Sequence, residues 1–89
     1  MGIKIGVAAD DVTGANDTGS TFGNGGFRSA VFPLGLTEGR NMEEEARGLD
    51  VIIIDTDSRF DEPEEAAGKV RRATEILMSL GCDRYFKKT

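Results

Sequence analysis

The sequence predicts an α/β domain with an open parallel sheet, in a Rossmann-like three-layer arrangement of about four strands and two to three helices. Apolar segments alternate with helical segments, as in βαβ units with right-handed crossovers. Residues 51–54 are uniformly aliphatic, which is typical of a central parallel strand covered on both faces. Carboxylates directly follow two of the apolar segments, where ligands bind in open α/β sheets. Because so few elements make a thin sheet, we expect an incomplete domain, the front portion of a larger one.

The first half of the chain is predicted to hold two strands and a glycine-rich helix. The first strand covers residues 3–9 and ends at paired aspartates. The helix covers about residues 15–24, although its internal glycines each cost about 1 kcal/mol relative to alanine. The second strand covers residues 28–34, and Pro33 ends it or confines it to a sheet edge. Residues 35–48 are predicted to form a loop or a short surface helix.

The second half of the chain contains the best-specified helix, between the aliphatic strand and a last strand at residues 84–88. Asp61 or Glu62 can cap this helix, Pro63 suits its first turn, and Gly81 ends it. Its predicted buried stripe consists of Ala66, Val70, Ala73, Leu77 and Leu80.

Composition and charge exclude several classes of protein. A net charge of −5 without a basic stripe argues against a nucleic-acid partner. The longest apolar run, at residues 51–54, is too short to span a bilayer, so no membrane partner is expected. A single cysteine cannot form an intramolecular disulfide, and a reducing cytoplasm is the expected compartment. The chain has no histidine, which removes histidine-based catalysis, and no metal site is predicted.

The stretch from Asp10 to Gly14 is the most informative part of the sequence. Two adjacent carboxylates at a strand end repel each other, so they favour a nearby cation, hydroxyl donor or helix N-terminus. Thr13 and Gly14 are predicted to form a turn, so that the free N–H groups of the following helix point back at Asp10 and Asp11. An ordinary acidic N-cap would account for one of these aspartates but poorly for the second.

Three strand ends are predicted to converge on one rim of the sheet. Their side chains are Asp10, Asp11 and Asp17 after the first strand, Asp55, Asp57 and Arg59 after the third, and Lys87 and Lys88 in the last. Carboxylates accept hydrogen bonds from sugar hydroxyls, and one can act as a general base. Arg59 can take a substrate carboxylate, or it can pair on the surface with Asp61 or Glu62 for about 0–1 kcal/mol. Side chains alternate along a strand, so only one of the two lysines can serve this rim. The rim suits a small anionic ligand rich in hydroxyls.

Three segments resemble motifs of the four-carbon acid sugar kinase family, whose members phosphorylate sugar acids such as threonate and erythronate. Residues 9–19 (Ala-Asp-Asp-Val-Thr-Gly-Ala-Asn-Asp-Thr-Gly) resemble that family's opening signature. Residues 51–59 (Val-Ile-Ile-Ile-Asp-Thr-Asp-Ser-Arg) resemble its second motif, and the same Pro-Glu-Glu-Ala helix start follows at residues 63–66. Residues 85–88 (Tyr-Phe-Lys-Lys) resemble the start of its third motif, which normally continues with Asp-Ser-Thr-Leu-Arg-Gly. The family's first helix has fewer glycines than residues 19–26 here.

The resemblance implies that residues 1–89 are the N-terminal part of a sugar-acid-binding domain whose C-terminal, ATP-binding partner domain is absent. ATP and Mg²⁺ would bind mainly outside this chain, which carries neither a Walker-type phosphate loop nor a dinucleotide fingerprint. We therefore expect this chain alone to have no kinase activity. Asp11 is the predicted catalytic base. The substrate-binding residues that the resemblance implies are Asp10, Asp11, Thr13, Gly14, Asp17, Asp57, Ser58, Arg59 and Lys88.

Two alternatives compete with this interpretation. The first is a phosphatase of the haloacid-dehalogenase type, with Asp55 as nucleophile and Asp57 as acid/base around Mg²⁺, although that motif normally opens its domain. The second is a non-catalytic fragment that only binds a small ligand. In either case, the thin sheet predicts low stability or self-association into a homo-oligomer.

Overall fold

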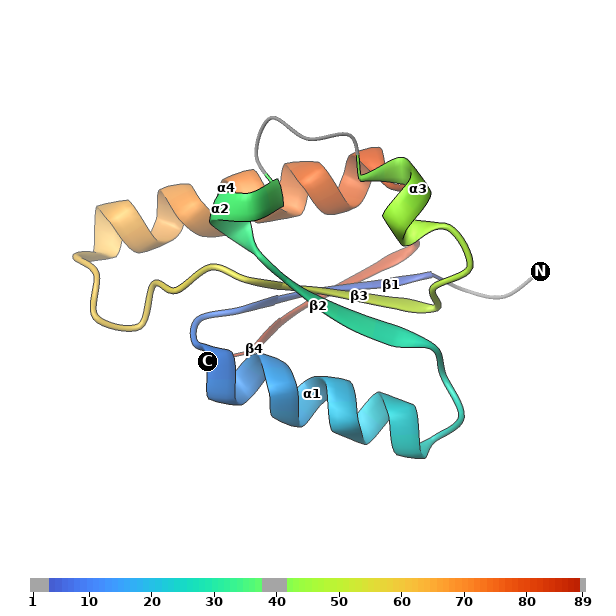
Figure 1. The fold of residues 1–89 in the computed structure, drawn as a ribbon. Helices are drawn as coiled ribbons and strands as arrows, with labels where there is room; N and C mark the ends of the chain where they lie inside the picture. The colour runs from blue at the N-terminus through green and yellow to red at the C-terminus, as the bar shows by residue number, and fades with distance from the viewer. Residues whose placement is uncertain (1–3, 38–41, 89) are drawn as a thin grey trace.

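The structure is a computed structural model that describes residues 4–37 and 42–88. The elements of this part of the chain are β1 (Ile5–Ala9), α1 (Val12–Asn24), β2 (Ser29–Pro33), α2 (Leu34–Thr37), α3 (Glu43–Ala46), β3 (Val51–Asp55), α4 (Pro63–Ser79) and β4 (Arg84–Lys88). The strands form one parallel sheet in the order β2-β3-β1-β4. α1 lies on one face of this sheet, and α4, α2 and α3 lie on the other (Figure 1). The predicted three-layer α/β fold is confirmed.

β3 occupies the centre of the sheet and supplies side chains to two cores, because successive strand residues point to opposite faces. Ile52 packs with Leu77 on the α4 face, and Ile53 packs with Ala15 on the α1 face. All four residues of the 51–54 segment are fully buried. The prediction of a parallel strand covered on both faces is therefore confirmed.

α1 begins at Val12, so it starts earlier than the sequence analysis predicts. Asp11 is its N-cap, with an extended backbone (φ −149°, ψ 166°), and accepts a hydrogen bond from the Gly14 N–H at 2.6 Å. Thr13 and Gly14 therefore lie in the first turn of the helix and not in a turn before it. The cap satisfies a donor that a helix start otherwise leaves unpaired, and this outweighs the low helix propensity of the glycine.

The segment between β2 and β3 contains two single-turn helices, α2 and α3, where the sequence predicts a loop or a short surface helix. Leu34 and Thr37 of α2 and Ala46 of α3 are buried. Helices of this length are marginal in water, so we attribute these turns to packing rather than to the local sequence. Residues 38–41 of this segment, like Ile3 of the predicted first strand, lie outside the described residues.

α4 agrees with its prediction in its bounds and its apolar stripe, but the Glu62 side chain at its N-cap makes no capping hydrogen bond. It begins at Pro63 with Glu62 at the N-cap, and Gly81 follows its last turn with a φ of 82° that favours glycine. Ala73 and Leu77 of the predicted stripe are buried, and the stripe's other members are half-buried. Among the described residues, no helix is long and apolar enough to cross a membrane.

The two edges of the sheet differ. β2 ends at Pro33, as predicted for a strand at the sheet edge. β4 pairs with β1 in the predicted range, but all five of its residues are exposed. Tyr85 and Phe86 of this strand are 43% and 55% exposed. The edge formed by β4 therefore presents aromatic side chains and unpaired backbone groups to solvent.

Candidate functional site

The carboxyl ends of all four strands meet in one row, in which Pro33, Asp55, Ala9 and Lys88 are register partners. Hydrogen bonds join the segments that leave this row. The Asp10 N–H donates to the Lys88 carbonyl at 3.1 Å, and the Asp10 carbonyl accepts from the Ser58 and Arg59 N–H groups at 2.9 and 3.1 Å. The convergence of these strand ends follows from parallel pairing and is present as predicted.

Asp11 links the start of α1 to the segment after β3. One carboxylate oxygen, Oδ1, accepts the Gly14 N–H at 2.6 Å, and the other, Oδ2, lies 2.9 Å from Nη1 of Arg59. Arg59 therefore pairs with Asp11, and its predicted alternative partner Asp61 pairs with Lys69. Because the Arg59 side chain is 59% exposed, its remaining donors are accessible to a ligand.

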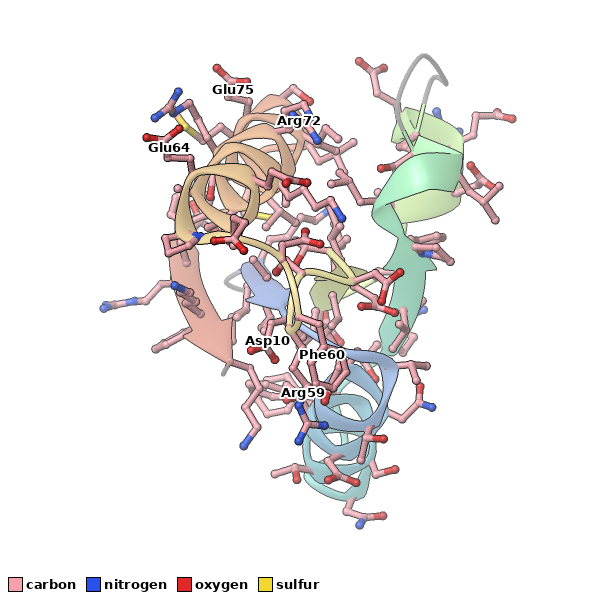
Figure 2. The ribbon with its side chains drawn as sticks, turned by 90° about the vertical axis from the view of Figure 1, so that its left-hand side faces the viewer. Asp10, Arg59, Phe60, Glu64, Arg72 and Glu75 are labelled. Carbon is pink, nitrogen blue, oxygen red and sulfur yellow. The ribbon has the colours of Figure 1, made fainter. Side chains whose placement is uncertain are left out.

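A cleft of about 240 Å³ lies where α1 begins. Figure 2 shows Asp10 and Arg59 together at this end of the sheet, away from the Glu64, Arg72 and Glu75 side chains of α4. The cleft is lined by Asp10, Asp11, Thr13, Gly14, Asp17 and Arg59, all of which the sequence analysis singles out.

The cleft combines several kinds of hydrogen-bonding group. Thr13 and Asp17 lie four residues apart on α1 and so share a helix face. The Arg59 guanidinium offsets the charge of Asp11, and the positive end of the α1 dipole favours negative charge at the same place. Carboxylates can accept from ligand hydroxyls, while Arg59 donates to a ligand anion.

Lys88 of β4 does not line this cleft but lies beside Gly14, which does. Its register partner is Ala9, on the α1 face of the sheet, whereas Lys87 is paired with Ala8 on the α4 face. A Cβ placed on Gly14 would lie 3.4 Å from Cγ of Lys88, so the lysine stem runs beside the first turn of α1. Lys88 is therefore the lysine of the pair that can serve the cleft, and its contact with a substrate remains a prediction.

Asp57 and Ser58 do not line this cleft. The Asp57 N–H donates to Asp55 Oδ1 at 2.9 Å, and Asp57 has a left-handed φ of 51°. This turn separates the side chains that follow β3. Ser58 is buried, with its hydroxyl 2.7 Å from that of Thr56, and Asp57 borders a second cleft. Direct contact of these two residues with the substrate stays a prediction.

The second cleft, of about 390 Å³, lies between the ends of β2 and β3 and α4. Asp55 and Asp57, the pair required by the phosphatase alternative, line it together with Lys69 and Arg72 of α4. Among the described residues, no group of three or more carboxylates or cysteines is arranged to hold a metal ion.

Two contributors to the site are absent from the sequence predictions. Thr56 is buried and donates from its hydroxyl to the Ala9 carbonyl at 3.1 Å, which ties the end of β3 to β1. Lys69 pairs with Asp61 at 2.7 Å, and this carboxylate raises the pKa of Lys69. The sequence signal for Lys69 points to the wrong partner, because Glu65 stands at the favoured helical spacing of four residues.

Comparisons with known proteins identify the family of the chain. A family described as a sugar-binding N-terminal domain matches residues 5–89. The chain is 39% identical over 72 residues to the D-erythronate kinase of Heliobacterium modesticaldum, a match that covers 81% of this chain and 16% of that protein. It is 33% identical over 87 residues to the D-threonate kinase of Bordetella bronchiseptica, covering 98% of this chain and 21% of that protein.

A solved structure shows the same fold. The crystal structure of a proposed tRNA synthase from Salmonella typhimurium LT2 matches with a TM-score of 0.79 and 31% identity, over 96% of this chain and 20% of that one. The chain thus spans about a fifth of the length of the proteins it matches. The resemblance to four-carbon acid sugar kinases is confirmed by these relatives. The chain belongs to the family of sugar-binding N-terminal domains.

Proposed function

We propose that this chain is the sugar-acid-binding portion of an ATP-dependent kinase that phosphorylates four-carbon sugar acids of the threonate or erythronate type. The observation that carries the proposal is the cleft in which Arg59 faces the carboxylates at the start of α1. A sugar acid has one carboxylate and several hydroxyls, which this combination of donors and acceptors complements. The kinase activities named for the relatives support the same class of substrate.

In this proposal Arg59 binds the carboxylate of the sugar acid. One of its nitrogens already contacts Asp11, and this contact fixes the orientation of the guanidinium. Phe60 lies beside it, with the guanidinium carbon 5.4 Å from the ring centroid. An arginine held in this way loses less side-chain freedom when it binds a ligand.

Asp10 and Asp17 are proposed to accept hydrogen bonds from the hydroxyls of the sugar acid. Asp11 is the catalytic base predicted from the sequence, but both of its oxygens are engaged, by Gly14 and Arg59. The Asp10 carboxylate lines the cleft and has no hydrogen-bond partner among the described residues. We therefore assign proton acceptance to Asp10 and the orientation of Arg59 to Asp11.

The phosphoryl donor is proposed to be ATP with Mg²⁺, bound mainly outside this chain. Phosphoryl transfer depends on groups that cradle the nucleotide phosphates and neutralise their charge. The sequence contains no Walker-type phosphate loop to do so. The residues of this chain would instead hold the sugar acid and accept a proton from the attacking hydroxyl.

Binding of D-erythronate and D-threonate to the chain, measured by calorimetry or by NMR titration, tests the proposal. Arg59→Ala should weaken binding by about 2 kcal/mol, or about thirtyfold, the lower end of the range for a charged partner because Arg59 is partly exposed. Arg47→Ala is the matched control, since Arg47 is an exposed arginine outside both clefts. Failure of the wild-type chain to bind either acid, or equal binding by Arg59→Ala, would refute the proposed site.

A further inference from the structure

The segment that carries Arg59, residues 56–61, crosses the end of the sheet between β3 and α4. On its inner side it is tied to Asp10, the residue that follows β1. The N–H groups of Ser58 and Arg59 both donate to the Asp10 carbonyl, at 2.9 and 3.1 Å. The position of Arg59 therefore depends on the backbone conformation of this whole segment.

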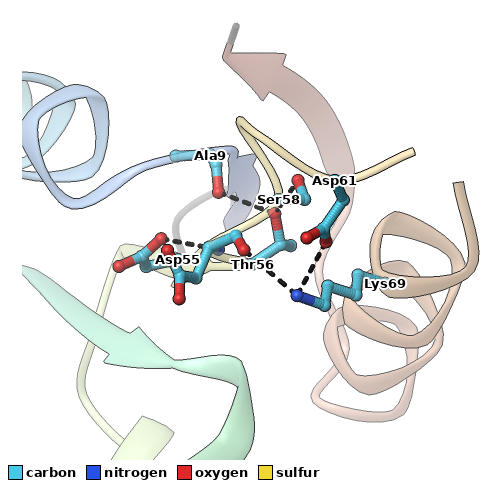
Figure 3. Close-up of polar contacts among 7 residues, drawn as sticks. Ala9, Asp55, Thr56, Ser58, Asp61 and Lys69 are labelled. Atoms are coloured by element: carbon cyan, nitrogen blue, oxygen red, sulfur yellow. Dashed lines mark hydrogen bonds and ion pairs between the residues drawn. The ribbon is translucent and has the colours of Figure 1, made fainter. Parts of the chain in front are cut away.

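Lys69 holds the same segment from the α4 side (Figure 3). Its ammonium donates to the Asp57 carbonyl at 3.1 Å and lies 2.7 Å from Oδ2 of Asp61. The two contacts lie on either side of Arg59 in the sequence. The side chains of Lys69 and Asp61 are only 28% and 21% exposed, so this pair is better shielded from water than the pair of Arg59 and Asp11.

These contacts stabilise an uncommon backbone conformation at Asp57. Its φ of 51° lies in the left-handed region, which residues with a Cβ adopt uncommonly and aspartate more often than most. Contacts on both sides of the residue favour this conformation over the alternatives. The Asp57 N–H is held by Asp55 at 2.9 Å, and the Asp57 carbonyl is held by Lys69.

We infer that Lys69 is a positioning residue for the sugar-acid cleft, because it fixes the backbone on which Arg59 is presented to Asp11 and to the substrate. Lys69 lines the second cleft and does not line the first, so it acts through Arg59 without touching the sugar acid. The expected effect of Lys69 on sugar-acid binding rests on the proposed function. Its effect on the backbone is independent of any ligand.

Limited trypsin digestion of the 89-residue chain reports on the backbone directly, because the bond after Arg59 is a tryptic site within the segment. Lys69→Met removes the ammonium and keeps an apolar stem of similar length. We expect Lys69→Met to speed cleavage after Arg59 severalfold, while cleavage after Arg47 stays unchanged. Lys69→Arg, which retains a cation, should restore most of the protection.

The matched control is Arg71→Met, which makes the same charge change on an exposed residue of the same helix and lines neither cleft. Arg71→Met should leave cleavage after Arg59 at the wild-type rate. A lysine with a general structural role would raise cleavage at both Arg59 and Arg47 and lower the melting temperature in proportion. The comparison of the two cleavage sites separates these cases.

Binding of D-erythronate and D-threonate by the same variants tests the consequence for the cleft. Lys69→Met should weaken binding about tenfold, a smaller loss than for Arg59→Ala, because Arg59 is still present but its backbone must be ordered when the ligand binds. Lys69→Arg should restore most of the affinity. Arg59→Ala, measured alongside, reports on the proposed function by itself.

The possible outcomes distinguish the two proposals. If Arg59→Ala weakens binding but Lys69→Met changes neither binding nor cleavage after Arg59, the positioning role is wrong and the proposed function stands. If the wild-type chain binds neither acid but Lys69→Met still speeds cleavage after Arg59, the proposed function fails and the hold on the segment stands. Equal cleavage after Arg59 in Lys69→Met and the wild type overturns the inference in every case.

Discussion

At the scale of single residues, Asp10 and Asp11 are neighbours in the sequence with different surroundings. Asp11 is occupied by Gly14 and Arg59, whereas the Asp10 carboxylate faces the cleft. In a longer kinase that contains this domain, we expect Asp10→Asn to lower kcat about 10²–10⁴-fold, the usual contribution of a general base. Asp11→Asn should instead mainly raise KM for the sugar acid, because asparagine still caps α1 but pairs weakly with Arg59.

Steady-state kinetics with varied sugar acid and saturating ATP measures this division between kcat and KM. The KM for ATP should stay near the wild-type value in both variants and serves as the control. A large loss of kcat in Asp11→Asn together with a mild effect of Asp10→Asn would identify Asp11 as the catalytic base, as the sequence predicts.

Cys82 is buried beside Leu77 and Gly6, and burial raises the pKa of its thiol. We expect native Cys82 to react slowly with a disulfide reagent at pH 8, because the thiolate is the reactive form. The pKa of the Cys82 thiol is therefore higher in the folded state than in the unfolded state. The stability that the buried, protonated thiol contributes is fully present below the unfolded pKa of about 8.5, and it is lost as the pH rises through the folded pKa. Reaction rates with and without urea, from pH 7 to 10, check this. A native rate equal to the rate in urea would contradict it.

At the scale of elements, the contact between β1 and α4 depends on a glycine. A Cβ on Gly6 would lie 3.0 Å from Cδ1 of Leu77 and 3.1 Å from Sγ of Cys82. Gly6→Ala should therefore lower the free energy of unfolding by about 1–3 kcal/mol through overpacking. Gly23→Ala is the matched control in α1, where an added Cβ would have no side chain and no backbone of another segment within 4 Å, and it should raise stability by about 0.5–1 kcal/mol. Urea unfolding of both variants measures the difference, and a neutral Gly6→Ala would show that α4 can shift away.

The elements that the sequence predicts well are those whose signal is local. The aliphatic run of β3 and the apolar stripe of α4 each carry their own periodicity, and Pro63 and Gly81 mark the helix ends. The start of α1 is predicted too late. Gly14 indicates a turn in the sequence, but the Asp11 cap allows the helix to begin at Val12. α2 and α3 depend on tertiary packing, which a pattern along the chain does not contain.

At the scale of the whole molecule, topology accounts for the part of the site that is predictable. Parallel pairing of β1 and β3 brings their carboxyl ends together, so the meeting of Asp10, Asp11 and Arg59 follows from the fold class. The pairing of Arg59 with Asp11 joins residues 48 positions apart, and its competitor Asp61 stands only two positions away. That choice depends on the backbone turn at Asp57, which no sequence pattern marks.

The exposed edge formed by β4 leads to a prediction for the chain as a whole. Phe86 is 55% exposed on the α1 face of a strand with one unpaired edge. We expect the 89-residue chain to self-associate or to melt below about 65 °C, the top of the usual mesophile range. Phe86→Ser should reduce self-association in analytical ultracentrifugation, and Phe60→Ser, which changes a 92% exposed phenylalanine elsewhere, is the control. A concentration-independent monomer that melts above this temperature would contradict the prediction.

The hydrogen bond from the Asp10 N–H to the Lys88 carbonyl also has a consequence for biosynthesis. The first aspartate of the cleft emerges early from the ribosome, but β4, the strand that fixes its backbone, is translated after β1, β2 and β3, on the order of ten seconds later. Until then β1 has only β3 beside it, and Lys88, which lies beside the first turn of α1, is absent. The nascent chain can therefore pair its central strands before the backbone of Asp10 is held on its β4 side.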